Sequence, residues 1–152
     1  MMRHMATTTE VDRMVELLGG KRRLGALPKA EFDFIPILRK GLPYRAVEAA
    51  LVALDIPTSD VVRILHIPLR TLARRRQAAR TLSTMESERF LRFIRVLARA
   101  QEVLGGRASA LTWMRTANRS LGSVPPEELL DTDIGSLAVL DTLGRLEHGV
   151  YG

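Results

Sequence analysis

Apolar residues recur every three or four positions along most of this 152-residue chain, which is the spacing of one buried face of an α-helix. No stretch alternates strictly between apolar and polar residues, as a half-buried strand would. Paired glycines and prolines separate the helical stretches. The pattern predicts an all-α fold, with helices over residues 10–18, 44–55, 58–65, 69–79, 83–104, 108–114 and 135–147, and another opening at Pro125-Pro126.

The breaks between these helices predict four successive units. They are an N-terminal helical extension (1–41), a helix-turn-helix module (42–82), a connecting helix (83–106) and a small helical C-terminal module (107–152). Within the extension, Phe32, Ile35 and Leu38 predict a short packed segment that Pro36 interrupts. In the connecting helix, Ser83 and Glu86 have the spacing of a capping box, so the helix is expected to begin there.

Residues 58–79 have the proportions of a helix-turn-helix motif, with two short helices joined by a tight turn. Thr58 or Ser59 is expected to cap the first helix. In the second helix, Leu72 and Ala73 are expected to face inward and pin it to its partner. An α-helix held in this way fits the major groove of DNA, where its exposed side chains reach the base edges.

The turn between the two helices departs from the usual pattern of such motifs. Many of them have Gly where His66 stands and Ser or Thr where Pro68 stands. Histidine can adopt the left-handed backbone that glycine favours, at some cost, and Ile67 is expected to anchor the turn in the core. The alternative is an ordinary helical hairpin with a solvated arginine face.

Positive charge is concentrated in the middle of the chain. Residues 63–107 hold eleven basic and three acidic side chains, whereas residues 108–152 hold three and six, and the whole chain carries a net charge of +6. A cationic stripe suits a polyanion, of which nucleic acid is the commonest, although a solvated helix face explains the charge equally well. The residues predicted to contact DNA are Thr58, Ser59, Arg70, Thr71, Arg74, Arg75 and Arg76.

The composition argues against catalysis and bound cofactors. Cysteine is absent, which excludes disulfides, thiolate catalysis and Cys-ligated metals. The three histidines lack metal-ligand spacing, and no nucleophile stands beside a plausible base. We therefore predict no catalytic residue, no metal and no cofactor. No apolar run is long enough to span a membrane, and the predicted location is cytoplasmic, without a membrane partner.

The C-terminal module contains a recognisable motif. The segment 110–122, Ala-Leu-Thr-Trp-Met-Arg-Thr-Ala-Asn-Arg-Ser-Leu-Gly, resembles the signature of the Xre/MbcA/ParS-type antitoxins, in which Trp-Leu is followed by Pro-Asn and then Leu-Gly-Gly. The similarity covers roughly residues 45–152. It departs from the family at Met114, Ala117 and Ser123, where the family has Leu, Pro and the second Gly.

This resemblance implies the antitoxin of a two-gene toxin–antitoxin system. Such an antitoxin binds a RES-domain toxin that consumes NAD⁺, blocks its active site and represses its own operon by binding operator DNA. The last helix and the tail are then expected to bind the toxin, whereas from the residues alone the tail is equally well a fraying terminus. The residues assigned to toxin binding are Arg145, Glu147, His148, Val150, Tyr151 and Gly152.

Four apolar residues of the C-terminal module have two possible roles. Trp113, the single tryptophan, is expected to be a core anchor. Leu137, Leu140 and Leu143 lie on one side of the last helix, where they form either the core or the interface of a homodimer. Two other functions remain open at this point, which are a protein-binding adaptor without DNA binding and a plain helix-turn-helix repressor with no toxin partner.

Overall fold

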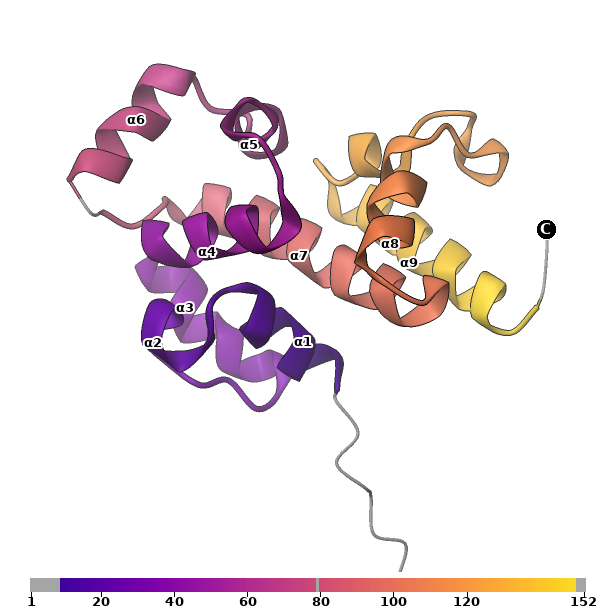
Figure 1. The fold of residues 1–152 in the computed structure, drawn as a ribbon, viewed down its shortest axis with the longest axis horizontal. Coiled ribbons are helices and arrows are strands. Elements are labelled where there is room, and N and C mark those ends of the chain that lie inside the picture. Colours follow the sequence, from indigo (N-terminus) through magenta and orange to yellow (C-terminus); the bar gives the residue numbers. More distant parts are fainter. Residues whose placement is uncertain (1–8, 79, 150–152) are drawn as a thin grey trace, which may run out of the picture.

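The computed structural model describes residues 9–78 and 80–149, and every regular element in those ranges is helical (Figure 1). The predicted all-α fold class is therefore confirmed, with a helix-turn-helix followed by a long helix and a small helical C-terminal module. The elements are α1 (Glu10–Leu17), α2 (Gly20–Leu24), η1 (Glu31–Asp33), α3 (Phe34–Lys40), α4 (Tyr44–Leu54), α5 (Thr58–Leu65), α6 (Leu69–Gln77), α7 (Thr84–Leu104), α8 (Arg107–Arg115), η2 (Arg119–Leu121), η3 (Pro126–Leu129) and α9 (Asp133–Glu147).

Helix α7 is the axis of the molecule. It begins at the predicted capping box, in which the Ser83 hydroxyl accepts from the Glu86 N–H at 3.1 Å and the Glu86 carboxylate accepts from the Ser83 N–H at 2.9 Å. It ends at Gly105, whose φ of 87° is the left-handed conformation that closes many helices. Most of its apolar residues are buried, and Phe90 and Ile94 are fully so, so α7 supplies the core that the other elements cover.

The remaining helices gather at the two ends of α7. Figure 1 places α4, α5 and α6 near its N-terminal end, and α8 and α9 at its C-terminal end. Helices α1, α3, α5, α8 and α9 all contact α7 directly. The long helix therefore connects the helix-turn-helix to the C-terminal module through a single continuous core.

The N-terminal extension differs from the prediction in its register. Phe34 rather than Phe32 enters the core, and Phe32 is 77% exposed. Pro36 does not interrupt the segment, because it occupies the first turn of α3, where the missing N–H has no intrahelical partner to lose. The aromatic residue closer to the chain start is thus solvated, and the next aromatic residue packs.

One element of the C-terminal module is shorter than predicted, because the segment opening at Pro125 forms only the 3₁₀ turn η3. Helix α9 begins at Asp133, two residues before the predicted start. The Thr132 hydroxyl caps the N–H of Gly135 at 3.0 Å. A side-chain carbon at Gly135 would collide with the carbonyl oxygen of Leu129, so this glycine permits η3 and α9 to approach closely.

Candidate functional site

The α5–turn–α6 unit has helix-turn-helix geometry despite its unusual turn. His66 adopts the left-handed conformation, with φ of 56°, and Ile67 is buried as predicted. Pro68, with extended backbone, occupies the position before α6. The turn therefore forms with histidine in the place where glycine is usual.

Two details of this unit contradict the prediction. Helix α5 begins at Thr58 with Pro57 in the capping position and no side-chain cap, so neither Thr58 nor Ser59 caps it. Both are exposed at its first turn. In α6, Leu72 is 1% exposed, as expected, but Ala73 is exposed rather than inward. A single leucine therefore holds the inner side of α6.

The outward side of α6 carries cations without partners. Arg70 and Arg74 are exposed, and they are four residues apart, which places them on one face of the helix. Neither forms an ion pair with another described residue. Thr71 beside them is partly buried. This face can donate in a planar, forked geometry to guanine edges or to phosphate oxygens.

The other two arginines of α6 form ion pairs with carboxylates of neighbouring helices. The guanidinium of Arg75 forms an ion pair with Glu86, a capping residue of α7 that is only 7% exposed. Arg76 pairs with Glu48 of α4 at 3.4 Å. Arg75, which the sequence predicted to contact DNA, therefore faces the carboxylate at the start of α7.

At the other end of the molecule, two residues assigned to toxin binding are held within the chain. Arg145 pairs with Asp141 of its own helix at 2.7 Å. Glu147 accepts from both terminal nitrogens of Arg99 of α7, at 2.5 and 3.1 Å. The hydrogen bond from Arg99 lowers the pKa of Glu147 below its usual range. His148 is exposed, and Val150, Tyr151 and Gly152 lie outside the described residues.

The apolar residues of the C-terminal module are divided between core and surface. Trp113 is only half-buried and packs against the core from its edge, whereas Met114 beside it is fully buried, so the core anchor is the methionine. On α9, Leu143 is buried and Leu140 partly buried, but Leu137 is 63% exposed. Leu137 is therefore available to a partner.

A chain of ion pairs, which the sequence did not reveal, joins the helix-turn-helix to the C-terminal module. Asp60 of α5 contacts Arg115 of α8 at 3.4 Å and Arg63 of its own helix at 3.2 Å. Arg63 also donates to Glu127 of η3 at 2.6 Å. Partners separated by more than fifty residues follow no local spacing rule, so no sequence signal could have identified them.

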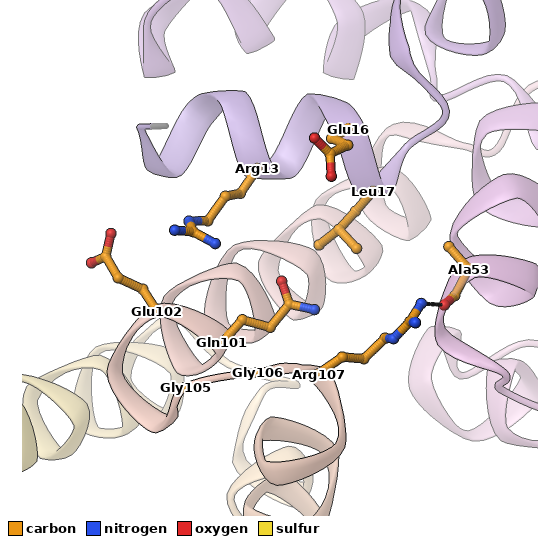
Figure 2. Close-up of a pocket in the computed structure, with 9 residues that line it drawn as sticks. All are labelled: Arg13, Glu16, Leu17, Ala53, Gln101, Glu102, Gly105, Gly106 and Arg107. Carbon is orange, nitrogen blue, oxygen red and sulfur yellow. Dashed lines mark hydrogen bonds between the residues drawn. The ribbon is translucent and has the colours of Figure 1, made fainter. Parts of the chain in front are cut away.

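A hollow of the described surface lies where α1, α4 and α7 meet the start of α8 (Figure 2). It encloses about 640 Å³ and is lined by two arginines and two glutamates, Arg13, Arg107, Glu16 and Glu102. Arg107 donates across it to the carbonyl oxygen of Ala53. This contact joins the start of α8 to α4.

Neither a metal site nor a membrane-spanning helix is found among residues 9–78 and 80–149. No group of three or more carboxylate or imidazole residues among the described residues is placed to hold a metal ion. Of the helices within residues 9–78 and 80–149, none combines the length and the apolar character needed to cross a bilayer.

Two protein-family models match this chain, one over the helix-turn-helix and one over the C-terminal module. Residues 33–95 match the antitoxin Xre-like helix-turn-helix domain, and residues 99–149 match the antitoxin Xre/MbcA/ParS C-terminal toxin-binding domain. The two models together cover most of the described chain. The N-terminal helices α1 and α2 precede both matched ranges.

Three relatives are similar over most of their length. Antitoxin Xre of Yersinia enterocolitica is 38% identical over 131 residues, which are 86% of this chain and 88% of that protein. Antitoxin Xre of Photorhabdus laumondii is 36% identical over 115 residues, covering 75% and 78%. A Sphingobium protein named Prs ADP-ribosylating antitoxin is 23% identical over 128 residues, covering 78% and 80%.

Proposed function

Because this chain belongs to the Xre antitoxin family, we propose that it neutralises a RES-domain toxin that degrades NAD⁺ and represses its own operon. The toxin is bound by the C-terminal module, whose tail blocks the toxin's active site. The operator is bound by α5 and α6 of a homodimer, which works in the cytoplasm where the DNA lies. The observation that carries the DNA half of this proposal is the exposed pair Arg70 and Arg74 on α6.

The contacts to DNA are assigned more narrowly than the sequence predicted. Arg70 and Arg74 reach the bases, with Thr71 beside them, while Thr58 and Ser59 contact a phosphate at the first turn of α5. Arg75 supports the fold through Glu86. Arg76 is weakly tied to Glu48, and its side chain is 63% exposed, so it can exchange this partner for a phosphate.

Operator binding is tested with a duplex taken from immediately upstream of the protein's own gene. Replacing Arg70 and Arg74 with Gln should abolish the preference for this duplex over an unrelated one, since each bidentate arginine contributes about 1–3 kcal/mol of base discrimination. The control is K29Q/R119Q, which removes the same charge from two exposed residues away from α6. Equal loss in both variants would refute the assignment to α6.

Toxin binding is assigned to the end of α9 and the residues that follow it. His148 is exposed, and the N–H groups of His148 and Gly149 donate to α9 carbonyl groups at 3.2 Å each, so these two residues complete the helix. Residues 150–152 can then be removed without uncapping α9. In this proposal Arg145 and Glu147 contact the toxin while remaining in their pairs with Asp141 and Arg99.

The toxin half is tested by co-expression with the product of the adjacent gene. Deleting residues 150–152 should leave the helical content and operator binding unchanged and should abolish rescue of cells that express the toxin. The variant Leu137→Ser serves as the control for dimerisation and should shift the protein from dimer to monomer in size-exclusion chromatography. A truncated chain that still rescues the cells would refute the tail as the inhibitory segment.

A further inference from the structure

Basic residues beside α6, but not on its outward side, form a second cationic surface. They are Lys21, Arg22 and Arg23 of α2, Arg39 and Lys40 at the end of α3, and Arg80 after α6, here called the lateral cationic face. We infer that this face binds the phosphate backbone of the duplex that flanks the site held by α6. The inference rests on the proposed operator binding, which it extends to a longer footprint.

Backbone pairing places the end of α6 against the corner between α3 and α4. The Tyr44 N–H donates to the carbonyl oxygen of Arg80 at 3.1 Å, and the Leu82 N–H donates to that of Leu42 at 2.8 Å. The Thr84 hydroxyl reaches the carbonyl oxygen of Arg39 at 3.4 Å. Arg80 is therefore held beside the basic end of α3, although about forty residues separate them in the sequence.

A hollow of about 540 Å³ lies at this junction, between the start of α4 and the end of α6. Three basic side chains line it, those of Lys40, Arg45 and Arg76, and Glu48 is the one acidic residue of its lining. Glu48 is paired with Arg76. The remaining charge of the hollow is positive, and its shape leaves room for a phosphate group to approach.

Helix α2 continues the cationic face on the other side of Arg45. The Arg45 side chain donates through Nε to the carbonyl oxygen of Arg23 at 2.9 Å, and α2 contacts α4. Lys21, Arg22 and Arg23 are all exposed. Figure 1 shows α6, α4 and α2 along the same side of the molecule, with α4 between the other two, so the face extends from the α6 end past α4 to α2.

The basic residues of the lateral cationic face, like Arg70 and Arg74 of α6, are not neutralised by carboxylates. None of Lys21, Arg22, Arg23, Arg39, Lys40 and Arg80 has an ion-pair partner among the described residues. By contrast, Arg92, Arg95 and Arg99 of α7 each pair with a carboxylate. Unneutralised charges of one sign repel each other and destabilise the folded chain. A polyanion relieves this repulsion, and the phosphate backbone beside α6 is the polyanion in reach.

The experiment compares two variants of equal charge. K21Q/R22Q removes two exposed cations from the lateral cationic face, and K29Q/R119Q removes two exposed cations elsewhere. Binding to the upstream duplex and to an unrelated duplex is titrated at several salt concentrations. K21Q/R22Q should weaken binding to both duplexes and reduce the slope of log K against log salt by about 2, at roughly 0.9 for each phosphate that is no longer neutralised. Circular dichroism and thermal unfolding check that both variants fold like the wild type.

The outcomes separate this inference from the operator proposal. If R70Q/R74Q loses the sequence preference while K21Q/R22Q matches K29Q/R119Q, the lateral cationic face has no part in binding and the inference is overturned alone. If the wild type binds neither duplex, both proposals are overturned. If K21Q/R22Q reduces the salt slope and R70Q/R74Q retains the sequence preference, the inference stands, but α6 does not recognise the operator sequence. A hydroxyl-radical footprint shortened on one flank by K21Q/R22Q supports the inference directly.

Discussion

Helices α6 and α7 each carry four arginines, but the surroundings of these arginines differ. On α7, Arg89 and Arg92 donate to backbone carbonyl oxygens of the helix-turn-helix and of the C-terminal module. Arg92, Arg95 and Arg99 also pair with carboxylates. On α6, only Arg75 and Arg76 have such partners. An arginine count therefore does not identify a binding helix, because the partners supplied by the fold decide which cations remain available.

The largest effect should come from removing the leucine that holds α6. Leu72→Ala deletes a side chain that is 1% exposed, and we expect it to lower the free energy of unfolding by about 4 kcal/mol. Leu69→Ala on the same helix removes a side chain that is 58% exposed and should cost less than about 0.5 kcal/mol. Urea denaturation measures both. Equal costs would mean that α6 is held by its ion pairs instead.

Removal of the buried acid that pairs with Arg75 should have the next largest effect on the free energy of unfolding. Glu86→Ala leaves a guanidinium without its carboxylate and removes half of a capping box. We expect a loss of roughly 3 kcal/mol, at the low end for a broken buried pair, because the Arg75 side chain is 23% exposed. Glu88→Ala, exposed on the same helix, is the matched control in the same denaturation experiment. A small loss at both positions would indicate that Arg75 is as free as Arg74.

On α7, the coupling between Arg99 and Glu147 should be smaller. Their side chains are 21% and 36% exposed, so solvent screens the pair. A double-mutant cycle with Arg99→Gln and Glu147→Gln should yield a small coupling energy that decreases as salt is added. A coupling as large as the loss from Glu86→Ala would show that the fold of α9 depends on this pair.

The smallest effect should come from Glu147→Gln and should appear in how stability decreases at acidic pH. Because the pKa of Glu147 is lowered in the folded chain from its ordinary value of 4.5, its ionised form stabilises the fold. This contribution is complete above about pH 4.5 and is lost as the pH falls through the lowered pKa. Thermal unfolding followed from pH 6 to pH 3 should therefore decline less steeply for Glu147→Gln than for wild type. If the two proteins lose stability equally as the pH falls, Arg99 does not lower the pKa of Glu147.

The sequence predicted those features that depend on local spacing. The capping box of α7, the all-α fold and the inward position of Leu72 follow from residues within one or two turns of each other. His66 was recognised as a residue that tolerates the left-handed turn, and it adopts this conformation. The Asn118 side chain accepts from the backbone N–H of Ser120 at 2.9 Å, which is a local contact typical of turns.

Features that depend on distant contacts could not be predicted. Arg75 turns inward because Glu86, in the next helix, is positioned by its own cap. On α9, Ser136 and Thr142 are buried while Leu137 is exposed, because the close approach at Gly135 sets which side of the helix faces inward. The Thr142 hydroxyl donates to the carbonyl oxygen of Ala138 at 3.0 Å, so burial leaves it satisfied. A hydrophobic periodicity cannot identify an inward face that contains hydroxyl residues.

The half-buried position of Trp113 makes one end of the molecule optically distinct. This residue is the only tryptophan of the chain, and it lies on α8. Indole emission therefore follows the C-terminal module, whereas far-ultraviolet circular dichroism follows helices at both ends. Since α7 passes through both ends within one core, the two signals should change at the same denaturant concentration. A partner that covers α8 should also shift the emission to shorter wavelength, which provides a label-free measure of its binding.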